Sequence, residues 1–368
     1  MTLSLTPVVV PASLDEPDAA DFLTLIDRIN VACRHDLGSD HLDDDPRIEL
    51  ANWHDQRDCR LSGLLARRDG EAVGAIILRV PQDAGTVSAE FELAVHPVTG
   101  DDRVGELLLG EAERQARAHG RRVLQAYTVH RVDQDVPRLV SPAGLGSVPL
   151  DEKARFYRAH GMVLGQVERN SNLDLTAPLD GVRERLDRAL QKAGADYRVV
   201  TWTIPTPERY KDDYARMQAR MSTDPPAGDI DWPIEQWDAA RIDRREATFH
   251  AGGQTMSVAG VEHIPTGELV AFSELVIGTD RTRPTHQWGT LVLPEHRGHR
   301  LGMIVKCANI LRWHELVPES PFITTFNAEE NRPMLDVNEA VGFVAVAYAA
   351  AWQKELASDP KPEPEPES

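Results

Sequence analysis

A turn in the last quarter of the chain combines residue types that bind anions. The run Thr290 to Leu293 has strand character and leads into Pro294-Glu295-His296-Arg297-Gly298-His299-Arg300-Leu301-Gly302, which precedes an amphipathic run ending at Trp313. The first turn of a helix leaves N–H groups unpaired and carries partial positive charge, while glycine lets an anion approach the backbone. Arg297 and Arg300 supply counter-charge. These residues predict a phosphate site between a strand and a helix.

Two familiar phosphate loops are excluded as explanations of this turn. The chain has no G-x-x-x-x-G-K-[ST] run, and it has no G-x-G-x-x-G followed by an acidic residue at dinucleotide spacing. The turn resembles the acyl-CoA pyrophosphate loop of the GNAT superfamily of N-acyltransferases, [R/Q]-x-x-G-x-[G/A]. Arg297 and Gly302 match its ends, and Arg300 stands at the first glycine position. An ordinary strand-to-helix turn with a solvated basic face is the alternative.

The residues after this helix extend the resemblance. Residues 321–327 are β-rich, Pro333 suits the first position of a short helix, and Gly342 suits its end. Strand, Asn, short helix, Gly-Phe and final strand is how a GNAT domain closes, so the resemblance spans roughly residues 197–353. This half is similar to the carboxy-terminal half of two-domain actinobacterial GNAT proteins, a group that includes mycothiol synthase.

The resemblance implies acetyl-CoA as the acyl donor and a set of residues that bind it. The backbone N–H of Leu293, or of a neighbour, is expected to hold the thioester carbonyl. Asn327 and Asn331 are expected either to bind the pantetheine arm or to cap the short helix. The expected cofactor-binding residues are Val292, Leu293, Arg297, Gly298, His299, Arg300, Leu301, Gly302, Asn327 and Asn331.

Amine attack on a thioester needs alignment, an oxyanion site and a proton acceptor. Glu274 lies in an apolar strand just before the cofactor strand and is the candidate base, because a similarly placed glutamate is the proposed base in mycothiol synthase. Its alternative is an outward-facing place in strand alternation. The family's Y-x-x-x-G-F tyrosine, which often protonates CoA, is replaced by Asn338. The remaining proton donors are Tyr348, the nearest tyrosine in the sequence, and solvent.

The order of predicted elements repeats in the two halves of the chain. We therefore expect an α/β fold of two tandem GNAT-like domains, each a mixed sheet with helices on both faces. The expected division is a degenerate domain at 1–180, a connector at 181–196, an acyl-CoA-binding domain at 197–357 and a disordered acidic, Pro-rich tail at 358–368. A single large α/β domain is the competing account.

The first copy lacks a usable phosphate turn. Its counterpart places Asp102 at the arginine position, Glu106 in the first helical turn and Leu107 at the second glycine position. A pyrophosphate would meet carboxylates there, so we expect this half to bind acyl-CoA poorly or not at all. It does keep Tyr157 at the position of the family's tyrosine.

Composition fits an enzyme of the cytoplasm. The 368 residues are 41 % hydrophobic, without an apolar run long enough to span a bilayer, and the N-terminus does not resemble a signal peptide. The net charge of −19 repels nucleic acid and favours cationic partners. Three scattered cysteines, and His296 and His299 without matching carboxylates, give no metal site.

These observations predict an N-acyltransferase that moves an acetyl group from acetyl-CoA to a primary amine of a small molecule. The alternatives are a catalytically silent acyl-CoA-binding or regulatory protein, and a transferase that uses a longer acyl-CoA or a non-amine acceptor. Neither the acceptor nor the oligomeric state can be derived from the sequence.

Overall fold

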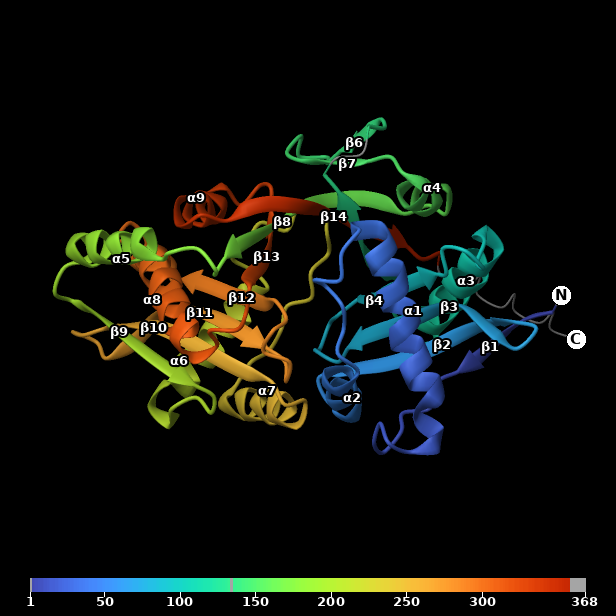
Figure 1. The fold of residues 1–368 in the computed structure, drawn as a ribbon, viewed down its shortest axis with the longest axis horizontal. Coiled ribbons are helices and arrows are strands. Elements are labelled where there is room, and N and C mark those ends of the chain that lie inside the picture. Colours follow the sequence, from blue (N-terminus) through green and yellow to red (C-terminus); the bar gives the residue numbers. More distant parts are fainter. Residues whose placement is uncertain (1, 133–134, 358–368) are drawn as a thin grey trace, which may run out of the picture.

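One continuous sheet crosses the whole molecule. The computed structural model describes residues 2–132 and 135–357. Within them twelve strands hydrogen-bond in the order β1-β2-β3-β4-β5-β14-β8-β13-β12-β11-β10-β9, with a separate two-stranded ribbon, β6-β7 (Figure 1). The expected α/β class with mixed pairing is confirmed, but the two expected sheets are joined edge to edge into one.

The strands are β1 (Leu3–Pro7), β2 (Cys59–Arg68), β3 (Glu71–Pro81), β4 (Ser88–Val95), β5 (Val123–Arg131), β6 (Arg138–Val140), β7 (Ser147–Pro149), β8 (Val163–Asp174), β9 (Tyr197–Thr203), β10 (Thr255–His263), β11 (Glu268–Ile277), β12 (Thr285–Val292), β13 (Phe322–Ala328) and β14 (Val344–Glu355). The helices are η1 (Pro17–Ala19), α1 (Ala20–Leu37), α2 (Pro46–His54), α3 (Asp102–Ala118), α4 (Glu152–Ala159), α5 (Asp180–Ala193), α6 (Glu208–Met221), α7 (Ala239–Ala251), η2 (Pro294–His296), α8 (Leu301–Leu316) and α9 (Arg332–Val341). Below, the amino-terminal half means β1 to β5 with α1 to α4, and the carboxy-terminal half means β9 to β13 with α5 to α9.

The two halves exchange their last strands at the centre of the sheet. β8 follows α4 in the chain but pairs with β13, and β14 ends the described chain but pairs with β5. Their side chains enter the opposite cores: Leu173 of β8 packs in the carboxy-terminal core, while Trp352 of β14 is fully buried in the amino-terminal core. Each half therefore completes its core with a strand from the other half.

Helices cover both faces of the carboxy-terminal sheet. On one face, Asn309 of α8 accepts a hydrogen bond from Ser257 of β10 at 2.7 Å. The next residue of β10, Val258, is opposite Glu274 of β11, and Glu274 contacts α6 and α7 on the other face. Because side chains alternate along a strand, α8 and the α6–α7 pair lie on opposite faces. α5 packs on α8, so residues 181–196 contribute to the carboxy-terminal core.

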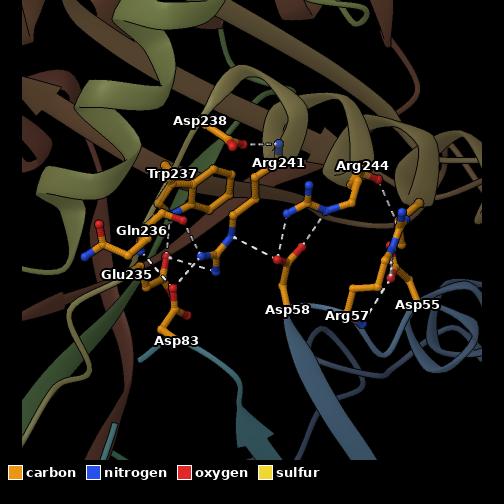
Figure 2. Close-up of polar contacts among 11 residues, drawn as sticks. Asp55, Arg57, Asp58, Asp83, Glu235, Gln236, Trp237, Asp238, Arg241 and Arg244 are labelled. Carbon is orange, nitrogen blue, oxygen red and sulfur yellow. Dashed lines mark hydrogen bonds and ion pairs between the residues drawn. The ribbon is translucent and has the colours of Figure 1, made fainter. Parts of the chain in front are cut away.

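Ion pairs join the two halves beside the sheet (Figure 2). Arg241 of α7 pairs with Asp83, which follows β3, at 2.8 Å. Arg244 of the same helix makes two hydrogen bonds to Asp58, at 2.7 and 3.0 Å. These are bidentate or largely buried contacts, the geometry in which an ion pair fixes orientation best. They hold α7 against the amino-terminal half.

Within the described ranges, no helix has the length and apolar character needed to cross a membrane. The expected tail at 358–368 lies outside the described residues.

Candidate functional site

The predicted anion-binding turn lies between β12 and α8, and its backbone is unusual. η2 follows β12 directly, Gly298 has φ of 87° and Arg300 has φ of 62°. A positive φ is uncommon outside glycine because the Cβ crowds the backbone, at a cost of about 1–2 kcal/mol. The resemblance expects glycine at this position, and Arg300 adopts a backbone conformation that glycine favours.

The N-terminus of α8 is open. Arg300 is its N-cap residue, and within residues 2–132 and 135–357 no side chain caps the helix and no acidic residue lies in its first turn. In the same residues the backbone N–H groups of Leu301, Gly302 and Met303 have no acceptor. A Cβ on Gly302 would meet only Val292, at 3.7 Å, so the backbone is accessible there. Unpaired N–H groups at a helix start favour an anion.

The basic residues of this turn differ in their contacts. Arg297 pairs with Asp224 at 3.0 Å and donates to the carbonyl of Val292 at 3.3 Å. His296 shares a hydrogen bond with Tyr197 at 3.1 Å, and the His299 ring lies 5.1 Å from the Tyr197 ring. Arg300 is exposed and has no ion pair with any described residue. The described residues contain no group of side chains suited to a metal ion.

Next to this turn, β12 and β13 pair in parallel only at Thr285 with Ile323 and at His286 with Thr324. Beyond these pairs the strands separate, and a cavity of about 360 Å³, here called the gap cavity, opens between them. Its lining comprises Gln166, Glu168, Met221, Ser222, Pro225, Pro226, Trp232, His286, Gln287, Trp288, Gly289, Thr290, Lys306, Thr324, Thr325, Phe326, Asn327, Ala328, Asn331 and Met334. Residues of α8 and α9 thus line the gap cavity on one face of the sheet, and residues of the α6–α7 loop line it on the other face.

The structure corrects one detail of the expected carbonyl site. The N–H of Leu293 donates to the carbonyl of Val270 in β11 at 3.0 Å, so it is not free to hold a thioester. In an antiparallel ladder adjacent residues point their N–H groups to opposite sides. The N–H of Val292, which is paired with Ala271 in register, is therefore directed towards the gap. Among the neighbours of Leu293, Val292 is therefore the residue whose N–H can take the expected role of holding the thioester carbonyl.

Three asparagines occupy the side of the gap cavity near α9. The side chain of Asn331 caps α9 by accepting from the Met334 N–H at 3.4 Å. Asn338 donates to the side-chain oxygen of Asn327 at 2.6 Å, and its own oxygen is buried without a partner among the described residues. Asn327 and Asn331 line the cavity, and Asn331 makes the expected cap of the short helix. Binding of the pantetheine arm by these residues stays a prediction.

Glu274, the expected base, occupies a different environment. It is 1 % exposed and accepts hydrogen bonds from Arg245 at 2.8 and 3.0 Å, from the Gly289 N–H at 3.2 Å, and from Tyr214 and Gln218. Burial alone would raise the pKa of Glu274, but the Arg245 charge and these hydrogen bonds hold it below its usual value. It is not part of the cavity lining. A paired carboxylate of low pKa is a poor proton acceptor, and the link between Glu274 and the cavity lining is its hydrogen bond from the Gly289 N–H.

Tyr348, the other expected catalytic residue, lies away from the gap cavity. It belongs to β14, where it pairs with His130 of β5 and Arg169 of β8, and it packs on the amino-terminal core. It is not among the residues that line the cavity. The strand exchange explains this position, because β14 follows α9 in the chain but pairs with β5 of the amino-terminal half.

Three titratable residues of the gap cavity were not singled out from the sequence: Glu168 of β8, His286 of β12 and Lys306 of α8. Lys306 left a signal, because it is a lysine within an otherwise apolar stretch of the helix. Glu168 left none, since nothing in its neighbourhood indicates that β8 crosses to the other half.

The corresponding turn of the amino-terminal half is closed by its own carboxylate. Asp101 is the N-cap of α3, accepts from the Val104 N–H at 3.2 Å and pairs with Arg68 at 2.7 Å. Glu106 and Leu107, which were expected to block this turn, lie about one helical turn further on and are exposed at the surface of α3. A carboxylate does lie at this helix start, as expected, but it belongs to Asp101 and not to Asp102 or Glu106.

The comparisons with known proteins agree with this architecture. Residues 26–136 match the Acetyltransferase (GNAT) family. The fold is similar to a tandem GNAT protein from the clavulanic acid biosynthesis pathway, with a TM-score of 0.75 and 23 % identity over 98 % of this chain and 100 % of that chain. It is also similar to a GCN5-related N-acetyltransferase from Sphaerobacter thermophilus, with a TM-score of 0.56 and 14 % identity over 97 % and 96 % of the two chains. A comparison with curated proteins finds no match. The chain has the tandem GNAT fold.

Proposed function

From the tandem GNAT fold as premise, we propose that the protein is an acyl-CoA-dependent N-acyltransferase with its active site in the gap cavity of the carboxy-terminal half. The observation that carries the proposal is the open, uncapped start of α8 beside the separated strands β12 and β13. The pyrophosphate would bind the N–H groups of residues 301–303, with Arg297 and Arg300 as counter-charge. The pantetheine arm would then follow β12 into the cavity, past Val292, with acetyl-CoA as the donor.

A cationic amine is the acceptor class that the charge of the molecule favours. A second cavity, of about 590 Å³, lies between the two halves and shares His286 and Trp288 with the gap cavity. Its lining includes six acidic residues and two arginines, Arg34 and Arg283, both of which pair with Asp43. The acidic residues are Asp27, Asp43, Asp44, Asp45, Glu49 and Asp280. Carboxylates along a cavity raise the local concentration of a cation. A primary amine that enters through this cavity would reach the acceptor side of the gap.

A catalytically silent acyl-CoA-binding protein is the second candidate. Asn338 supports it, because an amide bonded to Asn327 cannot protonate a departing thiolate. Both candidates bind acetyl-CoA, and only the enzyme consumes it.

The test is a screen of amines, including polyamines, aminoglycosides and amino-sugar thiols, with detection of released CoA. Calorimetry with acetyl-CoA accompanies it. We expect binding together with CoA release that depends on one class of amine. Binding without turnover for any amine would favour the silent protein, and absence of binding would remove both.

A further inference from the structure

The gap cavity contains titratable side chains on both faces of the sheet. Gln166 of β8 donates to the carbonyl of Pro226 in the α6–α7 loop at 2.9 Å. Glu168 follows two residues later, so strand alternation places its side chain on that same face. Lys306 comes from α8, on the opposite face, and both residues line the cavity. One carboxylate and one amine therefore approach the gap from its two sides.

Glu168 has the properties of a proton acceptor. Its side chain is half-buried, and its carboxylate makes no hydrogen bond or ion pair with any residue in the described ranges. Burial, together with the charge of Glu330, raises the pKa of Glu168 to about 7. A carboxylate of this pKa binds a proton far better than an ordinary glutamate and is still largely ionised slightly above neutral pH.

Lys306 has the properties of a proton donor. Its side chain is 1 % exposed, and its ammonium lies 5.4 Å from the centre of the Phe343 ring. Across the described chain it has neither an ion pair nor a hydrogen bond. Burial lowers the pKa of Lys306 to about 7. A buried lysine of this kind gives up its proton readily.

The other charged groups near Lys306 leave it unpaired. Cys307, its neighbour on α8, has a pKa raised by burial to about 12 and so stays a neutral thiol. On β12, His286 has a pKa lowered by burial to about 4 and is neutral as well. The charged residues of α9 pair with one another at the surface: Arg332 with Asp336 at 2.6 Å and with Glu339 at 2.6 Å. From β8, Glu168 faces the same cavity.

We propose that Glu168 and Lys306 are the acid–base pair of the carboxy-terminal site, with Glu168 supplied by the amino-terminal half through the exchanged strand. This inference rests on the proposed function. The acceptor first gives its ammonium proton to solvent. Its neutral nitrogen then forms a bond to the thioester carbon and loses one proton to the Glu168 carboxylate, directly or through water. The carbon–sulfur bond breaks, and the thiolate takes a proton from the Lys306 ammonium. Solvent then returns one proton to Lys306 and removes one from Glu168, so the protons balance.

The two roles give the pH profile a definite shape. Glu168 must be deprotonated, so activity falls as the pH drops through its pKa. Lys306 must be protonated, so activity falls as the pH rises through its pKa. We expect a bell-shaped kcat profile centred near neutrality. Glu168→Gln should remove the acidic limb, and Lys306→Met should remove the basic limb, each with a loss in kcat of roughly 10²–10⁴-fold.

One measurement needs no acceptor. Free CoA is titrated in its complex with the protein, and the thiolate is followed by its ultraviolet absorbance. A neighbouring ammonium favours a thiolate, so at pH values up to about 7, where Lys306 is still protonated, the wild-type complex should contain a larger fraction of thiolate than the Lys306→Met complex. Lys306→Met removes a buried charge and keeps a similar volume, so the fold should tolerate it. Lys192→Met, an exposed lysine of α5, is the matched control.

The outcomes separate this inference from the proposed function. Wild-type protein that fails to bind acetyl-CoA, or binds it without turnover of any amine, contradicts the proposed enzyme. Wild-type turnover that survives in folded Glu168→Gln and Lys306→Met variants, with both limbs unchanged, overturns the acid–base pair alone. Equal thiolate fractions in the wild-type and Lys306→Met complexes at pH values up to about 7 also remove Lys306 from the reaction. Loss of acetyl-CoA affinity equal to the loss of turnover would make the two residues structural.

Discussion

The two strand-to-helix turns of this protein occupy the same place in the fold and differ in what lies at the helix start. In the amino-terminal half Asp101 caps α3 and pairs with Arg68, so a carboxylate of the protein already uses a free N–H of the helix. In the carboxy-terminal half Arg300 is the N-cap of α8, and among the described residues no side chain occupies the helix start. A helix N-terminus can bind an anion only where the chain has not already supplied one.

This contrast shows that family likeness and an available anion site are separate properties. The match to the acetyltransferase family covers residues 26–136, which include the closed turn. The open turn belongs to the other half, which that match does not reach. One residue at the helix start, Asp101 or Arg300, makes the difference, because it decides whether the unpaired N–H groups face a carboxylate or a guanidinium.

The largest expected contrast between the two turns is in stoichiometry. A closed turn and an open one should give one acetyl-CoA bound per chain, in the carboxy-terminal half. Native mass spectrometry and calorimetric titration measure the number directly. Two sites of similar affinity, or a CoA molecule beside Gly105, would show that Asp101 does not close the first turn.

A side chain at Gly302 should abolish much of the binding. Gly302→Val places a branched group where the pyrophosphate approaches, and its Cβ meets only Val292 at 3.7 Å, so the fold should accept it. The loss of even one charge-assisted hydrogen bond costs roughly 1.5–3 kcal/mol, so affinity should fall at least about tenfold.

Arg103→Val is the matched control for Gly302→Val. Arg103 is exposed and stands two residues after the N-cap of α3, as Gly302 does in α8. Acetyl-CoA affinity measured by calorimetry should be unchanged in this variant. Unchanged affinity in a folded Gly302→Val protein would move the phosphate site elsewhere.

The smallest expected effect is on stability. Asp101→Ala removes the cap of α3, which costs about 1 kcal/mol, whereas its half-exposed pair with Arg68 adds little. Denaturant unfolding should show this loss while acetyl-CoA affinity stays the same. Asp102→Ala, one position later and without a capping bond, should lose less. Equal losses in the two variants would mean that Asp101 acts by charge alone and does not cap the helix.

Local sequence signals identified the elements well where they were self-contained. Strand β13 and helix α9 lie where the β-rich run 321–327 and the pattern from Pro333 to Gly342 predict them, because hydrophobic periodicity and turn residues act over short range. The turn between β12 and α8 could also be predicted, since strand, glycine, arginine and helix follow one another directly in the chain, and its role in binding phosphate stays a prediction. Strand β8 and helix α2 were not predicted; α2 begins after Asp45, which is its N-cap.

The candidate catalytic residues show where local signals end. Glu274 stands out in the sequence as an acid in an apolar strand. In the structure its carboxylate accepts hydrogen bonds from Arg245, Tyr214 and Gln218, which belong to other segments of the chain. Glu168 looks ordinary in sequence and becomes a cavity residue only because β8 pairs with β13. The environment of a carboxylate depends on partners that spacing along the chain does not reveal.

The sequence by itself determined the tandem α/β plan, the strand-to-helix turn at 297–302 and the presence of Asn338 where the resemblance expects tyrosine, because each depends on residues close together in the chain. Only the tertiary structure decided which half supplies which strand, that Asp101 is the carboxylate closing the first turn, and that Glu168 and Lys306 meet at one cavity. Strand order in a sheet is set by long-range pairing, and long-range pairing decides burial, hydrogen-bond partners and pKa.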